Sequence, residues 1–187
     1  MSRDKAELRS VGRKARVGLS TQQREQATDA VRRHLNHLLQ VRSIETVGLY
    51  SAMGSELGLE GFALDCQEAG TTLVWPRVNG PDQLVFHVLE GPEGLVPGWQ
   101  GILEPPVDAP IFDPAELDLL LVPGVCFDRN GGRLGQGGGY YDRMLAMLSR
   151  VHVVGVAFEV QVIERVPMGP LDVPVRGLVT EGGYQDL

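Results

Sequence analysis

LDLLLVPGVCF, residues 117–127, is followed after three residues by GGRLGQGGGYYDR, residues 131–143. The first stretch is a short apolar run of the kind that forms a fully buried strand. The second stretch packs six glycines, two arginines and an aspartate into thirteen positions, and a helical pattern begins at its end, near Tyr140. A buried strand that leads through a glycine-rich loop into a helix is typical of an α/β fold.

Strands and helices continue to alternate on both sides of this stretch. A helix is predicted at 57–70, closed by Gly70, and apolar or alternating runs predict strands at 44–52, 71–78, 82–90, 151–158 and 176–181. The sequence therefore predicts an α/β class protein: a single-domain layered fold over residues 1–187, with a mainly parallel central sheet flanked by helices. Ligands in such folds collect at the carboxyl ends of the strands.

The N-terminal part of the chain is predicted to be helical. Residues 20–40 open with Ser20 and place Gln23 three positions later, which is the capping-box pattern, and apolar residues then recur on one helical face. Residues 3–19 carry a weaker apolar pattern among basic residues and predict a shorter helix.

This N-terminal part is also basic. Residues 1–33 hold nine lysines and arginines against four acidic residues, although the whole chain has a formal net charge of −7. Lys5 and Arg9 are four positions apart and therefore share a helical face. We expect a basic helical segment, about residues 3–40, to pack on an acidic body.

Other features of the sequence argue against several classes of protein. There is no run of eighteen apolar residues, and the first ten residues lack the apolar region of a secretory signal, so we expect a cytoplasmic protein without a membrane segment. Cys66 and Cys126 lie far apart without a CxxC pattern and are expected to be buried, reduced thiols.

Hydrolase motifs are missing from the sequence. His34 and His37 are three positions apart but have no third metal ligand nearby, and neither HExxH nor GxSxG occurs. Neither cysteine has a basic neighbour in sequence that would activate it as a nucleophile.

The glycine-rich loop itself points to an anion. Consecutive glycines adopt positive φ angles and let backbone N–H groups converge on a phosphate, to which Arg133 adds a bidentate donor. The spacing GxGGG followed by tyrosine is neither the dinucleotide fingerprint nor a Walker A loop. From the residues alone, a nucleotide-phosphate site and a simple tight turn both remain open.

LLLVPGVCFDRNGGRLGQGGGYYDRML, residues 119–145, resembles the signature of the 5-formyltetrahydrofolate cyclo-ligase family. The segments KAELR, GLYSAMGSELGL, WPRV, GWQGILEPP and LDVPVRGLVTE match the family as well, in the family's order. The resemblance implies a NagB/RpiA/CoA-transferase-like fold and cyclisation of 5-formyltetrahydrofolate to 5,10-methenyltetrahydrofolate. The expected co-substrate is ATP, the expected cofactor is Mg²⁺, and the products are the methenyl compound, ADP and phosphate.

The resemblance also implies roles for individual residues. The nucleotide is expected to contact Lys5, Arg9, Arg133, Leu134, Gly135, Gly137, Gly138, Gly139 and Tyr140. The folate is expected to contact Tyr50, Glu56, Trp99 and Tyr141. Asp142 and Asp172 are the expected magnesium ligands, and Arg133 and Asp142 are the expected catalytic residues. The expected partners are the two substrates, without nucleic acid or membrane, in a monomer or weak homodimer.

The chain departs from the family pattern at three positions. Leu171 stands where many members have a histidine before the second aspartate, Gly138 stands where some members have a lysine, and Gln136 stands where tyrosine or arginine is frequent. These departures bear on rate and nucleotide affinity more than on the type of reaction. They also leave open a protein that binds the substrates without turnover.

Each of these assignments has a simpler structural alternative. Glu56 is alternatively a solvated loop carboxylate, Trp99 a core anchor, and Asp142 a residue that complements the dipole of the following helix. Lys5 and Arg9 are alternatively part of an exposed basic face, and a nucleic-acid-binding role for residues 3–33 is the second rival function.

Overall fold

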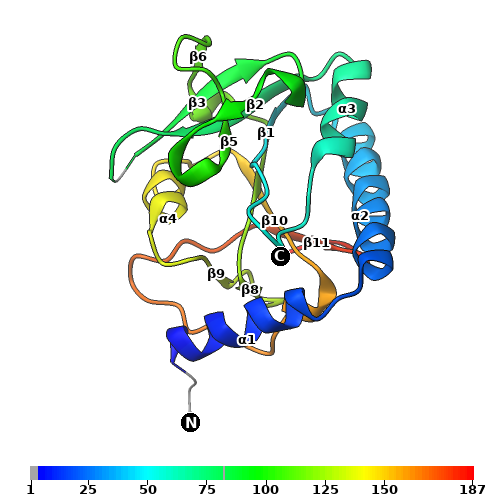
Figure 1. Cartoon of the computed structure of the whole chain (residues 1–187), viewed down its shortest axis with the longest axis vertical. Coiled ribbons are helices and arrows are strands. Elements are labelled where there is room, and N and C mark those ends of the chain that lie inside the picture. The colour runs from blue at the N-terminus through cyan, green and yellow to red at the C-terminus, as the bar shows by residue number, and fades with distance from the viewer. Residues whose placement is uncertain (1–3, 82) are drawn as a thin grey trace.

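The computed structural model describes residues 4–81 and 83–187, and within them an eight-stranded sheet forms the centre of the molecule (Figure 1). Arg3 and Asp82, at which two of the predicted elements begin, lie outside the described residues. The strand order is β12-β11-β10-β7-β1-β2-β3-β6. The sheet strands are β1 (Thr46–Gly48), β2 (Thr72–Val78), β3 (Leu84–Leu89), β6 (Ile111–Phe112), β7 (Leu119–Val122), β10 (His152–Val156), β11 (Gly177–Thr180) and β12 (Gly183–Asp186).

The middle of this sheet is parallel. The neighbouring strands β11, β10, β7, β1 and β2 run in one direction, whereas β12 at one edge and β3 and β6 at the other are antiparallel to their neighbours. The predicted mainly parallel sheet is confirmed. The likeness of this fold to the NagB/RpiA/CoA-transferase fold stays a prediction.

Helices cover both faces of the sheet, which explains why the central strand β7 is apolar throughout. On β7, Leu119 and Leu121 pack in the core cluster beneath α2 and α3, whereas Leu120 and Val122 pack in the cluster that includes α4. Figure 1 shows α2 and α3 together on one side of the sheet and α4 on the other. Successive strand residues point to opposite faces, so a strand buried on both faces reads as an unbroken apolar run.

The helices follow the sequence pattern closely. The helices are α1 (Lys5–Val17), α2 (Thr21–Arg42), α3 (Glu60–Glu68) and α4 (Tyr140–Leu145). The predicted capping box is present at the start of α2: the Ser20 hydroxyl accepts from the Gln23 N–H, and the Gln23 side chain accepts from the Ser20 N–H. The helix expected to begin near Tyr140 is present but short, because helical backbone ends at Leu145.

One strand prediction was wrong. Residues 117–127 do not form a single strand, because β7 ends at Val122, immediately before Pro123, which has no N–H to donate to a ladder. The chain then turns into a separate hairpin of β8 (Cys126–Phe127) and β9 (Arg133–Leu134), in which the Val125 N–H donates to the Leu134 carbonyl at 2.7 Å. The glycine loop therefore follows this hairpin and not the sheet strand itself.

A second small hairpin, β4 (Val96–Pro97) with β5 (Leu103–Glu104), was not predicted. It packs near the end of β2, where the Glu104 carboxylate accepts the Val78 N–H at 3.0 Å. Within the described residues, no helix combines the length and apolar character that crossing a bilayer requires.

The two cysteines are buried and unpaired with each other, as expected. Burial raises the pKa of the Cys66 thiol to about 12 and also raises the pKa of the Cys126 thiol. Both thiols are therefore protonated at neutral pH and are weak nucleophiles.

Candidate active site

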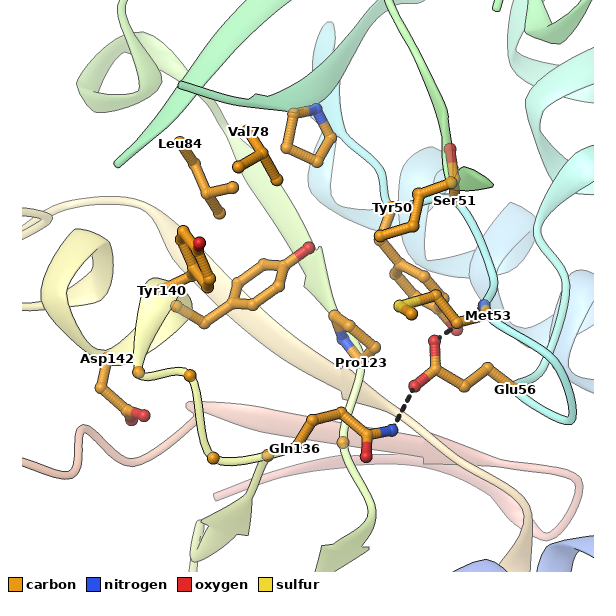
Figure 2. A pocket seen from close by; sticks show the side chains of 18 of the residues that line it. Tyr50, Ser51, Met53, Glu56, Val78, Leu84, Pro123, Gln136, Tyr140 and Asp142 are labelled. Carbon is orange, nitrogen blue, oxygen red and sulfur yellow. Dashed lines mark hydrogen bonds between the residues drawn. The ribbon is translucent and has the colours of Figure 1, made fainter. Parts of the chain in front are cut away.

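A cavity of about 690 Å³ opens where the parallel strands β1, β2 and β7 end. Tyr50 and Ser51 follow β1, Val78 is the last residue of β2, and Pro123 follows β7. In Figure 2, Val78, Leu84 and Tyr140 face Tyr50, Met53 and Glu56 across this space, with Pro123 and Gln136 between the two groups. The position agrees with the expectation that ligands bind at the carboxyl ends of parallel strands.

The structure brings all the predicted site residues around this one cavity. Its lining includes Lys5, Arg9, Tyr50, Glu56, Trp99, Arg133, Leu134, Gly135, Gly137, Gly138, Gly139, Tyr140, Tyr141, Asp142 and Asp172. They come from α1, the segment after β1, the β4–β5 hairpin, β9, the glycine loop, α4 and the segment before β11. Residues that are up to 167 positions apart in sequence are thus neighbours in space.

Arg133 and Asp142 form an ion pair at the polar end of the cavity. The Arg133 Nη2 donates to Asp142 Oδ1 at 2.8 Å, and only 2 % of the Arg133 side chain is exposed. The Val173 N–H also donates to Asp142 Oδ1, at 3.3 Å, and the Arg133 guanidinium lies over the Tyr141 ring at 5.7 Å from its centroid. Asp142 therefore does more than complement the dipole of α4.

A second ion pair joins α1 to the far end of the chain. Lys5 Nζ donates to Asp172 Oδ2, which also accepts the Gly169 N–H at 2.6 Å. Burial alone would raise the pKa of the Asp172 carboxyl, but the hydrogen bonds from Lys5 and Gly169 outweigh it and hold the pKa below its ordinary value. The Asp172 side chain is therefore a carboxylate throughout the neutral range.

Arg9, one turn further along α1, contacts the glycine loop directly. Its Nε donates to the Gly135 carbonyl at 2.9 Å. Lys5 and Arg9 thus share the helical face that the sequence predicted, and this face lines the cavity. A purely exposed basic face is excluded for these two residues.

The glycine loop needs glycine at two positions for its backbone. Gly137 has a φ of 112° and Gly139 a φ of 70°, both in the region that side chains disfavour. Arg143 donates from Nη2 to the Gly138 carbonyl at 2.9 Å and thereby braces the loop from α4. Leu134 packs its side chain into the small core cluster with Leu8.

The opposite end of the cavity is apolar and aromatic. Trp99 and Tyr140 contact edge to face with ring centroids 6.1 Å apart, and Trp99 is 43 % exposed, so it is not a core anchor. The apolar wall also contains residues that the sequence reasoning missed: Met53, Pro76, Val78, Leu84, Ile102, Leu103 and Pro123. Single apolar residues in loops and strand ends carry no sequence signal, so only the fold assembles them into a wall.

The buried Tyr50 and the partly buried Tyr141 complete the site. Tyr50 donates its hydroxyl to the Leu57 carbonyl at 2.7 Å, and burial, followed by the nearby charge of Glu56, raises the pKa of Tyr50 well above its ordinary value. Burial and then Glu56 raise the pKa of Tyr141 in the same way. Both phenols therefore remain protonated at neutral pH and can donate hydrogen bonds.

Residues 1–181 match the family described as the 5-formyltetrahydrofolate cyclo-ligase family. The chain belongs to this family. The 5-formyltetrahydrofolate cyclo-ligases of Haemophilus influenzae and Mycolicibacterium smegmatis are 29% and 30% identical to it, over 90% and 95% of this chain and 93% and 94% of their own lengths. The solved structure of Aquifex aeolicus 5,10-methenyltetrahydrofolate synthetase superposes with a TM-score of 0.87 at 35% identity, covering 98% of this chain and 92% of that one. The resemblance seen in the sequence is confirmed.

Glu56 of this cyclo-ligase family member is buried. Only 5 % of its side chain is exposed, so the alternative of a solvated loop carboxylate is wrong. Its Oε2 accepts the Met53 N–H at 3.0 Å, and its Oε1 faces the Arg16 guanidinium at 3.5 Å. Arg16 is itself only 4 % exposed, and nothing in the sequence singled it out from the other basic residues of α1.

The carboxylates suit the magnesium ion that the family resemblance implies. Mg²⁺ prefers hard oxygen ligands and is usually held by one or two carboxylates together with phosphate oxygens and water. Asp142 and Asp172 both line the cavity, and Val173, which follows Asp172, donates its N–H to Asp142. Among residues 4–81 and 83–187, no group of three His, Cys, Asp or Glu side chains forms a closed cage. A pair of carboxylates open to a phosphate-bearing ligand fits this donor requirement.

Two of the departures from the cyclo-ligase pattern have clear structural settings. Leu171 is 84 % exposed, so its side chain contributes nothing to the cavity beside Asp172. A side chain at Gly138 would begin 3.0 Å from the Tyr140 ring, so a longer residue there requires the ring to move.

Proposed function

We propose that this chain catalyses the ATP-dependent cyclisation of 5-formyltetrahydrofolate to 5,10-methenyltetrahydrofolate, with release of ADP and phosphate. The observation that carries the proposal is that one cavity joins the glycine loop and three cationic side chains to an aromatic, apolar wall. Its volume of about 690 Å³ lies in the range of small-molecule sites. The polar end suits a triphosphate, and the apolar end suits the ring system of a folate.

The reaction needs two steps: the formyl oxygen is phosphorylated, and N10 then displaces it from the formyl carbon. The formyl oxygen on N5 is a poor leaving group, so it first attacks the γ-phosphorus of ATP, which breaks the bond to ADP and gives an imidate phosphate. N10 then attacks the imidate carbon and releases its proton to solvent, a new C–N bond forms, and the formyl oxygen leaves with the phosphate. Because the first step is a phosphoryl transfer, the protein has mainly to position the reactants and neutralise charge.

The cationic side chains at the polar end of the cavity bind the nucleotide. Lys5, Arg9 and Arg133 contact the phosphates, together with the main chain of Leu134 to Gly139 and the first turn at Tyr140. Arg133 is the catalytic cation, because a buried guanidinium is desolvated already and stabilises the charge on a transferring phosphoryl group strongly. In the structure, Lys5 and Arg133 are paired with Asp172 and Asp142, so the phosphates replace these partners when ATP binds.

Asp142 and Asp172 would hold Mg²⁺ through their carboxylate oxygens. The ion, when bound, neutralises phosphate charge and orients the γ-phosphoryl group. Before ATP binds, Asp142 also holds the Arg133 guanidinium in place.

The folate lies against the aromatic side of the cavity. Trp99 and Tyr141 supply ring faces, and the buried Tyr50 closes the base of the pocket. Glu56 accepts hydrogen bonds from the pterin N–H groups, because a desolvated carboxylate is a strong acceptor for paired donors.

The first test is an assay of purified protein with Mg²⁺, ATP and 5-formyltetrahydrofolate, which follows the near-ultraviolet absorbance of the methenyl product. We expect product only when ATP and Mg²⁺ are both present, and one ADP released for each product formed. Chelation of Mg²⁺ should stop the reaction, and re-addition should restore it. ATP hydrolysis that does not depend on the folate, or binding of both substrates without product, would contradict the proposal.

A second prediction concerns the placement of α1. Gly12 lies where α1 crosses the β8–β9 hairpin, and a Cβ at this position would come within 2.6 Å of both the Val125 carbonyl oxygen and Cys126 Sγ. Gly12→Ala should therefore displace α1 and with it Lys5 and Arg9. We expect the KM for ATP to rise by about tenfold. A displacement of about 1 Å in the groups that position a substrate lowers the reaction rate by up to about 10²-fold.

The matched control for this variant is Gly61→Ala in α3. The added Cβ would lie 3.3 Å from Nη1 of Arg32, the end of a flexible side chain that is able to yield. The KM for ATP of this control should stay at the wild-type value. A Gly12→Ala enzyme with an unchanged KM for ATP would show that α1 does not position the nucleotide.

A further inference from the structure

Gln136 connects the glycine loop with the segment that follows β1. Its side-chain Nε2 donates to Glu56 Oε1 at 3.1 Å, a contact that Figure 2 marks between the two halves of the cavity. Gln136 lies between Gly135 and Gly137, in the loop assigned to the phosphates, whereas Glu56 is assigned to the folate. One hydrogen bond therefore joins the two substrate sites.

A third residue fixes which way the Gln136 amide points. Arg13 on α1 donates from Nε and Nη2 to the Gln136 Oε1, at 3.1 and 2.7 Å. A guanidinium has only donors, so it takes the oxygen of the amide and leaves the NH₂ group to face Glu56. The amide is thereby set as a donor toward the carboxylate.

The orientation of Glu56 matters because it is buried. Its remaining contacts are the Met53 N–H on the other oxygen and the long 3.5 Å contact to Arg16. A buried carboxylate that turns away from its donors loses hydrogen bonds that water does not replace. Through the hydrogen bond from the Gln136 amide, the position of the glycine loop affects the orientation of the Glu56 carboxylate.

We propose that Gln136 is a positioning residue that couples the binding of ATP to the binding of the folate. This inference rests on the proposed function. When ATP fixes the glycine loop, the Gln136 amide is fixed with it and holds the Glu56 carboxylate in one orientation before the folate arrives. The second ligand then meets a site that is already ordered, and by thermodynamic reciprocity the folate strengthens ATP binding by the same factor.

Titration calorimetry of the full chain tests the coupling. The Kd of a non-hydrolysable ATP analogue with Mg²⁺ is measured with and without saturating 5-formyltetrahydrofolate, and the reverse titration closes the cycle. We expect each ligand to tighten the other by about tenfold in the wild type, a typical size for coupled sites. The ratio should fall below about twofold in Gln136→Ala, while the Kd of each ligand alone changes less than the coupling does.

A second variant separates the hydrogen bond from the general packing of the loop. Gln136→Glu keeps an oxygen acceptor for Arg13 but has no donor for Glu56, so it should lose the coupling as well. The matched control is Gln67→Ala, because Gln67 Nε2 makes a comparable exposed hydrogen bond to Glu93 Oε1, at 3.4 Å, outside the cavity. The coupling in this control should equal that of the wild type.

The outcomes distinguish this inference from the function on which it rests. Coupling that persists in both Gln136 variants, or a wild type that binds each ligand without coupling, overturns the role of Gln136 and leaves the proposed function standing. A wild type that binds neither ligand overturns both.

Discussion

Replacing Asp142 by asparagine should lower kcat/KM for methenyl formation by at least about 10²-fold, the typical cost of removing one group that stabilises transition-state charge. Asparagine has nearly the same shape and still offers an oxygen to Arg133, but it has no charge to hold Mg²⁺ or to balance the buried guanidinium. The loss should appear mainly in kcat, because the carboxylate acts on the transferring phosphoryl group. Steady-state assays at saturating ATP and folate measure it.

The matched control for this variant is Asp65→Asn. Asp65 also forms an ion pair with an arginine, Arg32, but does not line the cavity. We expect the control to keep the wild-type kcat/KM even if its melting temperature falls. An Asp142→Asn enzyme with wild-type kcat would refute the assignment of Asp142 as a catalytic and metal-binding residue.

Gly137→Ala should raise the KM for ATP by roughly 10- to 100-fold. Gly137 has a φ of 112°, a conformation that costs a residue with a side chain about 1–3 kcal/mol, and the loop avoids this cost by moving. Its added Cβ would only make an ordinary van der Waals contact with the Arg9 guanidinium, at 3.6 Å, so the effect comes from the backbone conformation. This movement displaces the backbone N–H groups that we assign to the phosphates, so the main effect falls on nucleotide binding.

Gly70→Ala is the matched control for backbone strain. Gly70 has a φ of 75° at the end of α3, nothing lies within 4 Å of an added Cβ, and the residue is outside the cavity. This variant should lose stability by about 1 kcal/mol without any change in the KM for ATP. If both variants lower the melting temperature and neither alters the KM for ATP, the glycine loop does not cradle the phosphates.

Much of the fold was predictable because its signals are local. The capping box of Ser20 and Gln23 is complete within four residues, and it starts α2 where the sequence predicted. The apolar runs at 71–78 and 151–158 likewise contain the strands β2 and β10. Such signals act between neighbouring residues and so can be identified before the chain is folded.

The hairpin after β7 was missed for a physical reason. The apolar pattern of residues 117–127 is continuous, and Pro123 interrupts the hydrogen-bonding ladder without interrupting the hydrophobicity. The residues before and after Pro123 are all apolar because both strands, β7 and β8, are buried. The hydrophobic pattern therefore does not reveal that the chain leaves the sheet at this proline. The edge strand β12 was missed as well, because its half-exposed residues carry little apolar pattern.

The sequence by itself determined the long helices, most strands of the central sheet, the glycine loop and, through its family resemblance, the polar and aromatic side chains that we assign to the substrates. Only the tertiary structure decided how those side chains are paired. Lys5 meets Asp172 across 167 positions, Gln136 meets Glu56 across 80, and Arg16 is buried against Glu56 while its basic neighbours on α1 are not. Helix periodicity places a residue on a face, but the partner of that face depends on how distant elements pack, and that information is spread over the whole chain.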